Sequence, residues 1–280
     1  MIMDLFADHA GPILFGILNV TPDSFSDGGR YRTSEEAVDH GLRMAGEGAQ
    51  AIDVGGESTR PGAAPVDEEL QRDRVLDVIA RLRARLPGTV RISIDTTRAS
   101  VASAALDCGA EIINDVSAGL DDPVMLGLAA QAGCPIILMH RAPPRRNAEG
   151  EPLYHDVVAE VASFLNARAA AAIAAGVPKE HIIVDPGICF GKRSRHNLAL
   201  LAALDRLVDV GRPVLLGASR KNYLGRLSPD AVPTERLPET CAATVIGVMA
   251  GVRMFRVHDV RENRRAADAA WAIRQARDEG

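Results

Sequence analysis

Eight short apolar runs recur along the chain, and most of them end in a polar residue. They occupy residues 16–19, 51–54, 92–95, 112–115, 136–140, 182–185, 214–217 and 254–258. Runs of this length that are rich in β-branched residues are typical of strands buried on both faces of a parallel sheet. We therefore predict eight short strands.

The segments between these runs carry apolar residues at helical spacing. Three sets show it best: Val75, Val78, Ile79, Leu82 and Leu86; Val157, Val158, Val161, Leu165 and Ala169; and Leu200, Leu201, Leu204, Leu207 and Val208. Residues three and four apart share one face of a helix, so each set predicts one helix. Thr33 and Glu36 have the spacing of a capping box at the start of the first helix. Glycines stand where helices should end, at Gly109, Gly133, Gly176 and Gly211.

Strands that alternate with helices, without a break in composition, favour one α/β domain. We predict a single (β/α)8 TIM barrel over residues 1–280, with its core at about 13–275. A doubly wound sheet, the alternative, usually has fewer strands. In a barrel of this kind the active site lies at the C-terminal ends of the strands.

Composition narrows the class of protein. Hydrophobic residues make up 47% of the chain and charged residues 25%, and the formal net charge of -5 gives no reason to expect nucleic acid or an anionic membrane as a partner. The four cysteines form no CxxC pair, which argues against a zinc site or a disulfide framework. Residues 1–10 carry no basic patch, and the apolar run at 241–252 is too short to cross a bilayer. We expect a soluble cytoplasmic protein.

Polar side chains gather at the predicted carboxyl ends of the strands. Asp185 ends an apolar strand, which Pro186 and Gly187 then stop. The other polar residues at this level are Asn19, Asp95, Asn114, Arg256 and His258. Any one of them could merely cap a loop, but together they predict an active site at the mouth of the barrel.

Several motifs closely resemble the dihydropteroate synthase family. The two longest are Asn-Val-Thr-Pro-Asp-Ser-Phe-Ser-Asp-Gly-Gly at 19–29 and Asp-Val-Gly-Gly-Glu-Ser-Thr-Arg-Pro-Gly at 53–62. Shorter matches lie at 93–96, 113–116, 185–187, 190–192, 219–221 and 256–259. The resemblance implies a barrel transferase of folate synthesis that uses Mg2+. It would join 6-hydroxymethyl-7,8-dihydropterin diphosphate to 4-aminobenzoate, releasing diphosphate and forming 7,8-dihydropteroate.

Chemistry and resemblance agree on the pterin site. The pterin edge presents two parallel donors, which match the two oxygens of a carboxylate such as Asp185. Asn114 can donate and accept at once, and Lys221 can bond ring acceptors or lie against the flat face. By resemblance the pterin pocket consists of Asp95, Asn114, Asp185 and Lys221, and the catalytic set of Asp95, Asp185, Lys221 and Asp27.

The diphosphate requires cationic donors. Arg256 offers a fork of N–H groups and His258 one or two more, and the resemblance adds Asn19 and Thr59, with Asn19 as the Mg2+ ligand. Alternatives are a surface ion pair from Arg256 to Asp259 or Glu262, a core histidine at His258, and a turn residue at Asn19.

The resemblance assigns the aminobenzoate site mainly to two glycine-rich loops, at 23–31 and 55–64, which we expect to act as lids. Its residues are Phe25, Thr59, Arg60, Pro61, Phe190 and Ser219. Arg60 could instead be a solvated loop charge. The chain departs from the family pattern at Cys189, usually Gly, at Asn222, usually Ser, and in the loop at 141–152. These departures bear on the aminobenzoate site and on the response to sulfonamides, for which the family is a target.

Two other functions fit parts of the pattern. A pterin-binding corrinoid methyltransferase would share the pterin carboxylate, but it would have no use for the diphosphate residues. A non-catalytic pterin-binding paralogue would show decay at the matched positions. The resemblance also implies a homodimer, for which the segment at 240–249 is a candidate face.

Overall fold

Eight parallel strands form the centre of the molecule. The computed structural model describes residues 9–20, 33–57, 66–141, 145–146, 152–223 and 232–278. The strands are β1 (Ile13–Asn19), β2 (Ala51–Gly55), β3 (Arg91–Asp95), β4 (Ile112–Asp115), β5 (Ile136–Met139), β8 (Ile182–Asp185), β9 (Leu215–Leu216) and β10 (Met254–Val257). Each of the eight predicted runs overlaps one of these strands, so the strand prediction is confirmed.

The strands close into a barrel. Their order is β8-β5-β4-β3-β2-β1-β10-β9, and every neighbouring pair is parallel. The two end strands meet through a parallel bridge between Val184 and Val214. The Val184 N–H also donates to the Pro213 carbonyl at 3.0 Å. The predicted (β/α)8 TIM barrel is therefore confirmed.

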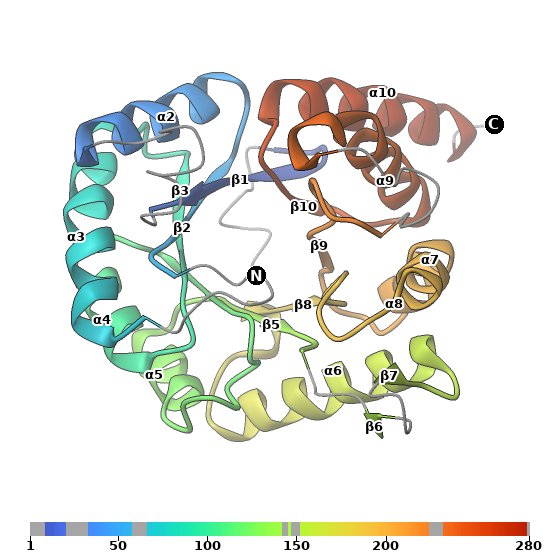
Figure 1. Cartoon of the computed structure of the whole chain (residues 1–280), viewed down its shortest axis with the longest axis horizontal. Coiled ribbons are helices and arrows are strands. Elements are labelled where there is room, and N and C mark those ends of the chain that lie inside the picture. Colours follow the sequence, from blue (N-terminus) through green and yellow to red (C-terminus); the bar gives the residue numbers. More distant parts are fainter. Residues whose placement is uncertain are drawn as a thin grey trace.

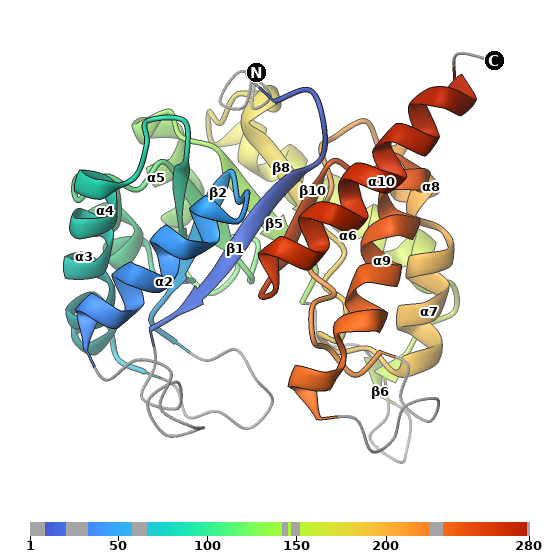
Figure 2. The ribbon, with the colours of Figure 1, turned by 90° about the horizontal axis from the view of Figure 1, so that it is seen from above.

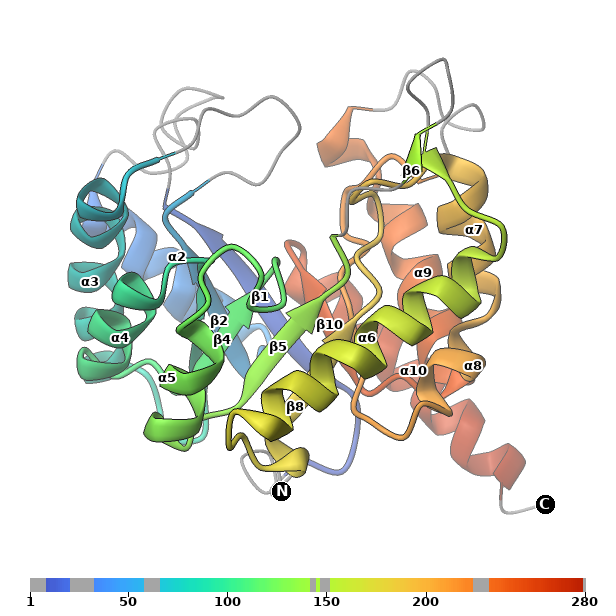
Figure 3. The same ribbon diagram turned by 90° about the horizontal axis from the view of Figure 1, so that it is seen from below.

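Helices surround the strands (Figure 1). They are α2 (Ser34–Gly46), α3 (Glu68–Arg85), α4 (Ala99–Asp107), α5 (Met125–Ala132), α6 (Val157–Ala174), α7 (Ser194–Ala202), α8 (Leu204–Val208), α9 (Leu237–Ala250) and α10 (Val260–Asp278). Two short 3-10 helices, Lys179–His181 and Pro233–Glu235, precede β8 and α9. Helices α9 and α10 lie side by side against the last strands (Figure 2). A two-stranded antiparallel hairpin, β6 (Arg145–Arg146) and β7 (Pro152–Leu153), lies beyond the carboxyl end of β5 (Figure 3).

The helix predictions are mostly confirmed. Thr33 Oγ1 accepts a hydrogen bond from the Glu36 N–H at 3.3 Å, which is the Thr33 half of the capping box. The four helix-ending glycines all have positive φ. One prediction was wrong, because the set from Leu200 to Val208 belongs to two helices that are divided at Ala203. The apolar spacing does not reveal this break, since Leu200, Leu204 and Leu207 are buried on either side of it.

Alternation along the strands separates two apolar clusters. Outward-facing residues pack beneath the helices and form the larger cluster. Inward-facing residues form a separate cluster that we call the apolar layer: Ile13, Phe15, Ala51, Ile112, Ile137, Ile183, Leu215 and Met254. These residues lie toward the amino ends of their strands. The apolar layer fills the lower part of the barrel, so a ligand has room only at the carboxyl ends.

Helix α6 is the one described helix that is long and apolar enough to cross a membrane by length and composition. It packs against β5 and β8 as part of the barrel wall. Six of its residues are buried there, including Val161 and Leu165. Its apolar character is explained by this packing and by its many alanines.

Candidate active site

The strands that carry the apolar layer also carry the polar site. Side chains two residues apart on a strand face the same side, so the inward-facing series continues toward the carboxyl ends. It reaches Asp53 on β2, Asn114 on β4, Asp185 on β8 and Arg256 on β10, and on β3, which has no residue in the apolar layer, Asp95 follows the buried Ser93 by two positions. All except Arg256 are buried. The convergence predicted from the sequence is therefore present among the described residues.

Arg256 lies between two carboxylates. Its Nε donates to Asp53 Oδ2 at 2.5 Å, and its Nη2 donates to Asp95 Oδ2 at 2.6 Å. Burial opposes the charge, yet these carboxylates raise the pKa of Arg256 above its usual value. The alternative of a surface ion pair with Asp259 or Glu262 is wrong, since Arg256 pairs with the buried Asp53 and Asp95. Arg256 is thus a fixed cation inside the barrel.

Asp53 is a site residue that the sequence analysis did not single out. It has no exposed surface, and its Oδ2 accepts from Asn114 Nδ2 at 3.1 Å as well as from Arg256. Its Oδ1 has no hydrogen-bond partner among the described residues. A carboxylate in the middle of the strand sequence Ala-Ile-Asp-Val-Gly was the available signal, because an unpaired charge would be costly there.

The electrostatics of Asp95 follow from its burial. Burial raises the pKa of Asp95 from 3.8 to about 7, Asp53 adds to the rise, and Arg256 opposes it. Burial likewise raises the pKa of Asp185, whose strongest opposing neighbour is Lys221. Burial therefore favours the neutral form of both acids. N–H donors from a bound ligand would stabilise their charged forms.

Asp185, Lys221 and Arg256 meet around Gly217. A Cβ added at Gly217 would lie 3.4 Å from Asp185 Oδ2, 3.7 Å from Lys221 Nζ and 4.0 Å from Arg256 Cβ. Glycine at this position adds no side chain of its own between the three groups. Lys221 Nζ also lies 4.7 Å from the centre of the Phe190 ring, in a cation–π contact. The predicted acid and the predicted cations therefore share one side of the mouth.

His258 contacts Ser219 on the neighbouring loop. The His258 ring Nδ1 lies 3.0 Å from Ser219 Oγ, and the His258 backbone N–H donates to the same oxygen at 3.1 Å. Ser219 is buried, whereas His258 is half-buried. The contact is to a hydroxyl group, whereas the core-histidine alternative predicted a backbone carbonyl.

Lys192 is a second residue whose place the sequence analysis did not foresee. Its Nζ lies 2.8 Å from His140 Nδ1 and donates to the carbonyls of Gly187 at 2.9 Å, Phe190 at 3.0 Å and His140 at 3.2 Å. Burial lowers the pKa of Lys192 to about 7 and that of His140 to about 3. Lys192 thus ties the loop after β8, which carries Phe190, to the end of β5.

Two departures from the family pattern can be placed. Cys189 has a φ of 70°, a left-handed conformation that glycine adopts without strain. Its N–H donates to Asn197 Oδ1 at 2.8 Å, which holds this conformation. Asn222 is exposed beside Lys221.

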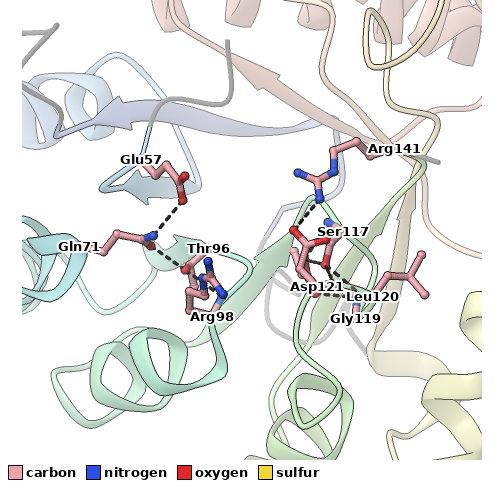
Figure 4. Close-up of polar contacts among 10 residues, drawn as sticks. Glu57, Gln71, Thr96, Arg98, Ser117, Gly119, Leu120, Asp121 and Arg141 are labelled. Carbon is pink, nitrogen blue, oxygen red and sulfur yellow. Dashed lines mark hydrogen bonds and ion pairs between the residues drawn. The ribbon is translucent and has the colours of Figure 1, made fainter. Parts of the chain in front are cut away.

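A chain of hydrogen bonds lies behind the ends of β2 and β3 (Figure 4). Buried Gln71 donates to Glu57 Oε2 at 2.8 Å and accepts from Thr96 Oγ1 at 3.0 Å, and Thr96 Oγ1 accepts from the Arg98 N–H at 3.2 Å. The chain connects Glu57 to the residue that follows Asp95. Figure 4 also shows Arg141, the first residue of the loop that departs from the family pattern, paired with Asp121 at 2.5 Å.

Of the remaining predicted residues, the structure describes Asn19 but not five others. A Cβ at Gly55 would lie 3.6 Å from Asn19 Oδ1 and 3.6 Å from Asp95 Oδ2, so the two oxygens border the same space. The part of the chain that the structure describes contains no group of three or more His, Cys, Asp or Glu residues suited to a metal ion.

Five predicted residues lie outside the described residues: Phe25, Asp27, Thr59, Arg60 and Pro61.

Comparison with known proteins identifies the class to which this fold and site belong. A sequence model described as "Pterin binding enzyme" matches residues 15–258. The barrel, with buried carboxylates and fixed cations at one end, is that of a pterin-binding enzyme.

Individual relatives are more specific. Dihydropteroate synthase of Mycobacterium leprae is 48% identical over 254 residues, covering 89% of this chain and 88% of the relative. The Bacillus subtilis dihydropteroate synthase is 44% identical over 255 residues, 91% of this chain and 86% of the relative. The chain belongs to the dihydropteroate synthase family and is a transferase of folate synthesis.

Solved structures of dihydropteroate synthases have the same fold as this chain. Xanthomonas albilineans dihydropteroate synthase with 4-aminobenzoic acid has a TM-score of 0.86 and 44% identity, covering 94% of this chain and 93% of that one. The Yersinia pestis enzyme in a sulfonamide drug complex has a TM-score of 0.88 and 41% identity, covering 95% of each chain.

Proposed function

We propose that the barrel mouth binds 6-hydroxymethyl-7,8-dihydropterin diphosphate and 4-aminobenzoate and joins them into 7,8-dihydropteroate, with release of diphosphate. The observation that carries this proposal is the arrangement of Asp185, Lys221 and Arg256 around Gly217. An acid that can bind a heterocycle edge lies there beside a cation that can bind phosphate.

The pterin lies at the inner end of this site. Asp185 accepts from the exocyclic amine and the adjacent ring N–H, and Asn114, held by Asp53, bonds the mixed donors and acceptors of the ring edge. Asp95 accepts from the ring system, and Lys221 lies between the pterin and Phe190. The pterin thereby supplies N–H donors to two buried acids.

The diphosphate lies toward Arg256, His258, Asn19 and Thr59. Mg2+ usually keeps several waters and takes one or two protein oxygens together with substrate phosphates. Asn19 Oδ1, beside the Asp95 carboxylate, suits that mode of binding. The bound ion would neutralise charge on the departing diphosphate.

The reaction breaks the C–O bond to diphosphate and forms a C–N bond to the arylamine. The electron-rich ring can carry positive charge on the departing carbon, so the buried carboxylates of Asp95 and Asp185 stabilise the cation-like transition state. Arg256 and His258 stabilise the negative charge that develops on the leaving group. The arylamine is neutral at pH 7 and loses its proton to solvent after attack, so no strong general base is required.

The molecule is expected to act in the cytoplasm as a homodimer. Helix α9 carries the apolar residues Val245 and Ile246, which are 37% and 49% exposed. This surface lies within the 240–249 segment and supports it as the dimer face.

Diphosphate release is the test. The purified protein is incubated with the pterin diphosphate, with and without 4-aminobenzoate and Mg2+. Release that requires both additions, with formation of dihydropteroate, is expected. Tight pterin binding without turnover would instead indicate a non-catalytic paralogue, and methyl transfer from a methylated tetrahydrofolate to a corrinoid would indicate the methyltransferase.

A further inference from the structure

Two adjacent contacts join the loop after β9 to the end of β10. In the first, Ser219 contacts His258 through both the ring and the backbone N–H. In the second, Arg220 forms a bidentate ion pair with Asp259, in which Nε lies 2.9 Å from Oδ2. We call this pair of contacts the β9–β10 clamp.

The Ser219 contact is compatible with a neutral His258 ring that carries its proton on Nε2. Ser219 Oγ accepts the His258 backbone N–H, and its own proton can then be donated to the ring Nδ1 at 3.0 Å. A neutral imidazole has one donor and one acceptor nitrogen. When Nδ1 accepts from Ser219, the proton of the neutral ring resides on Nε2, which becomes a hydrogen-bond donor.

The Arg220 contact holds the loop in a conformation that it would not otherwise favour. Arg220 has a φ of 57°, which is strained for a residue with a side chain. Its backbone N–H donates to Thr240 Oγ1 at 3.0 Å, and its carbonyl accepts from Arg236 Nη1 at 3.3 Å. Backbone and side chain are therefore both fixed, and Ser219 and Lys221 lie on either side of this fixed residue.

We propose that Ser219, Arg220 and Asp259 are positioning residues that hold His258 with its Nε2–H as a donor at the barrel mouth and hold Lys221 beside Asp185. This inference rests on the proposed function, because it assigns the Nε2–H to the diphosphate. Arg220 and Asp259 touch no substrate in this proposal and act only through their neighbours.

Variants of Arg220 separate the ion pair from the backbone turn. Arg220→Gly keeps the left-handed turn and removes the ion pair. We expect it to remain folded and to lose roughly tenfold or more in kcat/KM for the pterin diphosphate, since a 1 Å misplacement of a binding group can cost up to about 10²-fold. The charge-reversed pair Arg220→Asp with Asp259→Arg should recover part of the loss seen in either single variant.

A matched control uses another partly buried ion pair, Arg91 with Glu111, at the amino ends of the strands. Arg91→Gln should leave kcat/KM unchanged. Wild-type kcat/KM in Arg220→Gly, or a charge-reversed pair no better than the single variants, would overturn the role of the ion pair.

The tautomer is measured without any substrate. Long-range 1H–15N NMR of the wild-type protein, at a pH where the ring is neutral, should show His258 with the proton on Nε2. Ser219→Ala should lose this preference, and Ser219→Thr, which retains the hydroxyl, should keep it. A proton on Nδ1 in the wild type would overturn the inference. If only the proposed function is wrong, NMR still shows the His258 proton on Nε2, but no diphosphate is released.

Discussion

Asp53 and Arg256 form an ion pair inside the barrel between β2 and β10, the two strands that flank β1, with Asp53 Oδ2 2.5 Å from Arg256 Nε. The carboxylate has no exposed surface, and 17% of the arginine side chain is exposed. The guanidinium is therefore held from within the barrel while part of it remains available at the mouth. Asp53 therefore fixes the position of the Arg256 guanidinium before any ligand binds.

Asp53→Asn tests this preorganisation. The substitution keeps the shape but removes the charge that holds Arg256 Nε, while Asp95 still contacts Nη2. We expect kcat/KM for the pterin diphosphate to fall by roughly 10²-fold, because misplacement of a positioned group costs about that much. Steady-state kinetics measure the fall, and circular dichroism confirms the fold. An unchanged kcat/KM in a folded variant would show that Asp95 alone positions Arg256.

Asp185→Asn tests the pterin edge. One acceptor oxygen becomes an N–H donor that faces the donors of the pterin in a buried site. We expect the affinity for the bare pterin to fall by about 1–3 kcal/mol, the cost of an unsatisfied buried group. Calorimetric titration measures it, with Asp205→Asn on the exposed face of α8 as the control. Wild-type affinity in Asp185→Asn would refute the assignment.

Arg256→Ala tests the diphosphate assignment. Loss of the guanidinium should weaken binding of the diphosphorylated substrate far more than binding of the corresponding pterin alcohol, because only the former presents phosphate oxygens. Dissociation constants for the two ligands are compared by titration. Equal losses for both would remove Arg256 from the phosphate role and leave it as a partner of Asp53 and Asp95.

The raised pKa of Asp95 predicts a pH dependence of stability. Between pH 3.8 and about 7 the folded protein keeps a proton on Asp95 that the unfolded chain has lost. The contribution is therefore fully present below pH 3.8 and is lost as the pH rises through about 7. Urea unfolding across this range should show that the stability of the wild type relative to Asp95→Asn decreases with rising pH. A difference that grows with pH would mean that the pairing with Arg256 outweighs burial.

Cys189 tests the left-handed turn after β8. This conformation costs a residue with a side chain roughly 1–2 kcal/mol, whereas for glycine the cost is only chain entropy, about 0.5–1 kcal/mol. Cys189→Gly should therefore be as stable as the wild type or more stable by up to about 1 kcal/mol. Cys189→Val should be less stable by about 2 kcal/mol or more, since branching at Cβ worsens the clash. Denaturant unfolding ranks the two, and a more stable valine variant would contradict the assigned backbone conformation.

Much of the fold could be predicted from the sequence, because short apolar runs and helical spacing report burial directly. The division between α7 and α8 at Ala203 could not. A break in a helix depends on backbone angles at one alanine, and the leucines on either side keep their spacing.

The site was predictable to the level of strand ends and no further. Asn114, Asp185 and Arg256 were found because they stand at or near the ends of apolar runs. The sequence analysis did not single out Asp53 and Lys192, because their place in the site depends on contacts with residues that are 203 and 52 positions away in the chain. Spacing along a sequence does not reveal which distant partner balances a buried charge.

The eight residues of the apolar layer have a practical consequence for protein engineering. They lie beneath the site residues and have no exposed surface, so the packing of this part of the barrel is separate from the polar groups at the mouth. We expect volume-conserving substitutions at Ile13, Ile112 or Ile183 to change the melting temperature more than the turnover number.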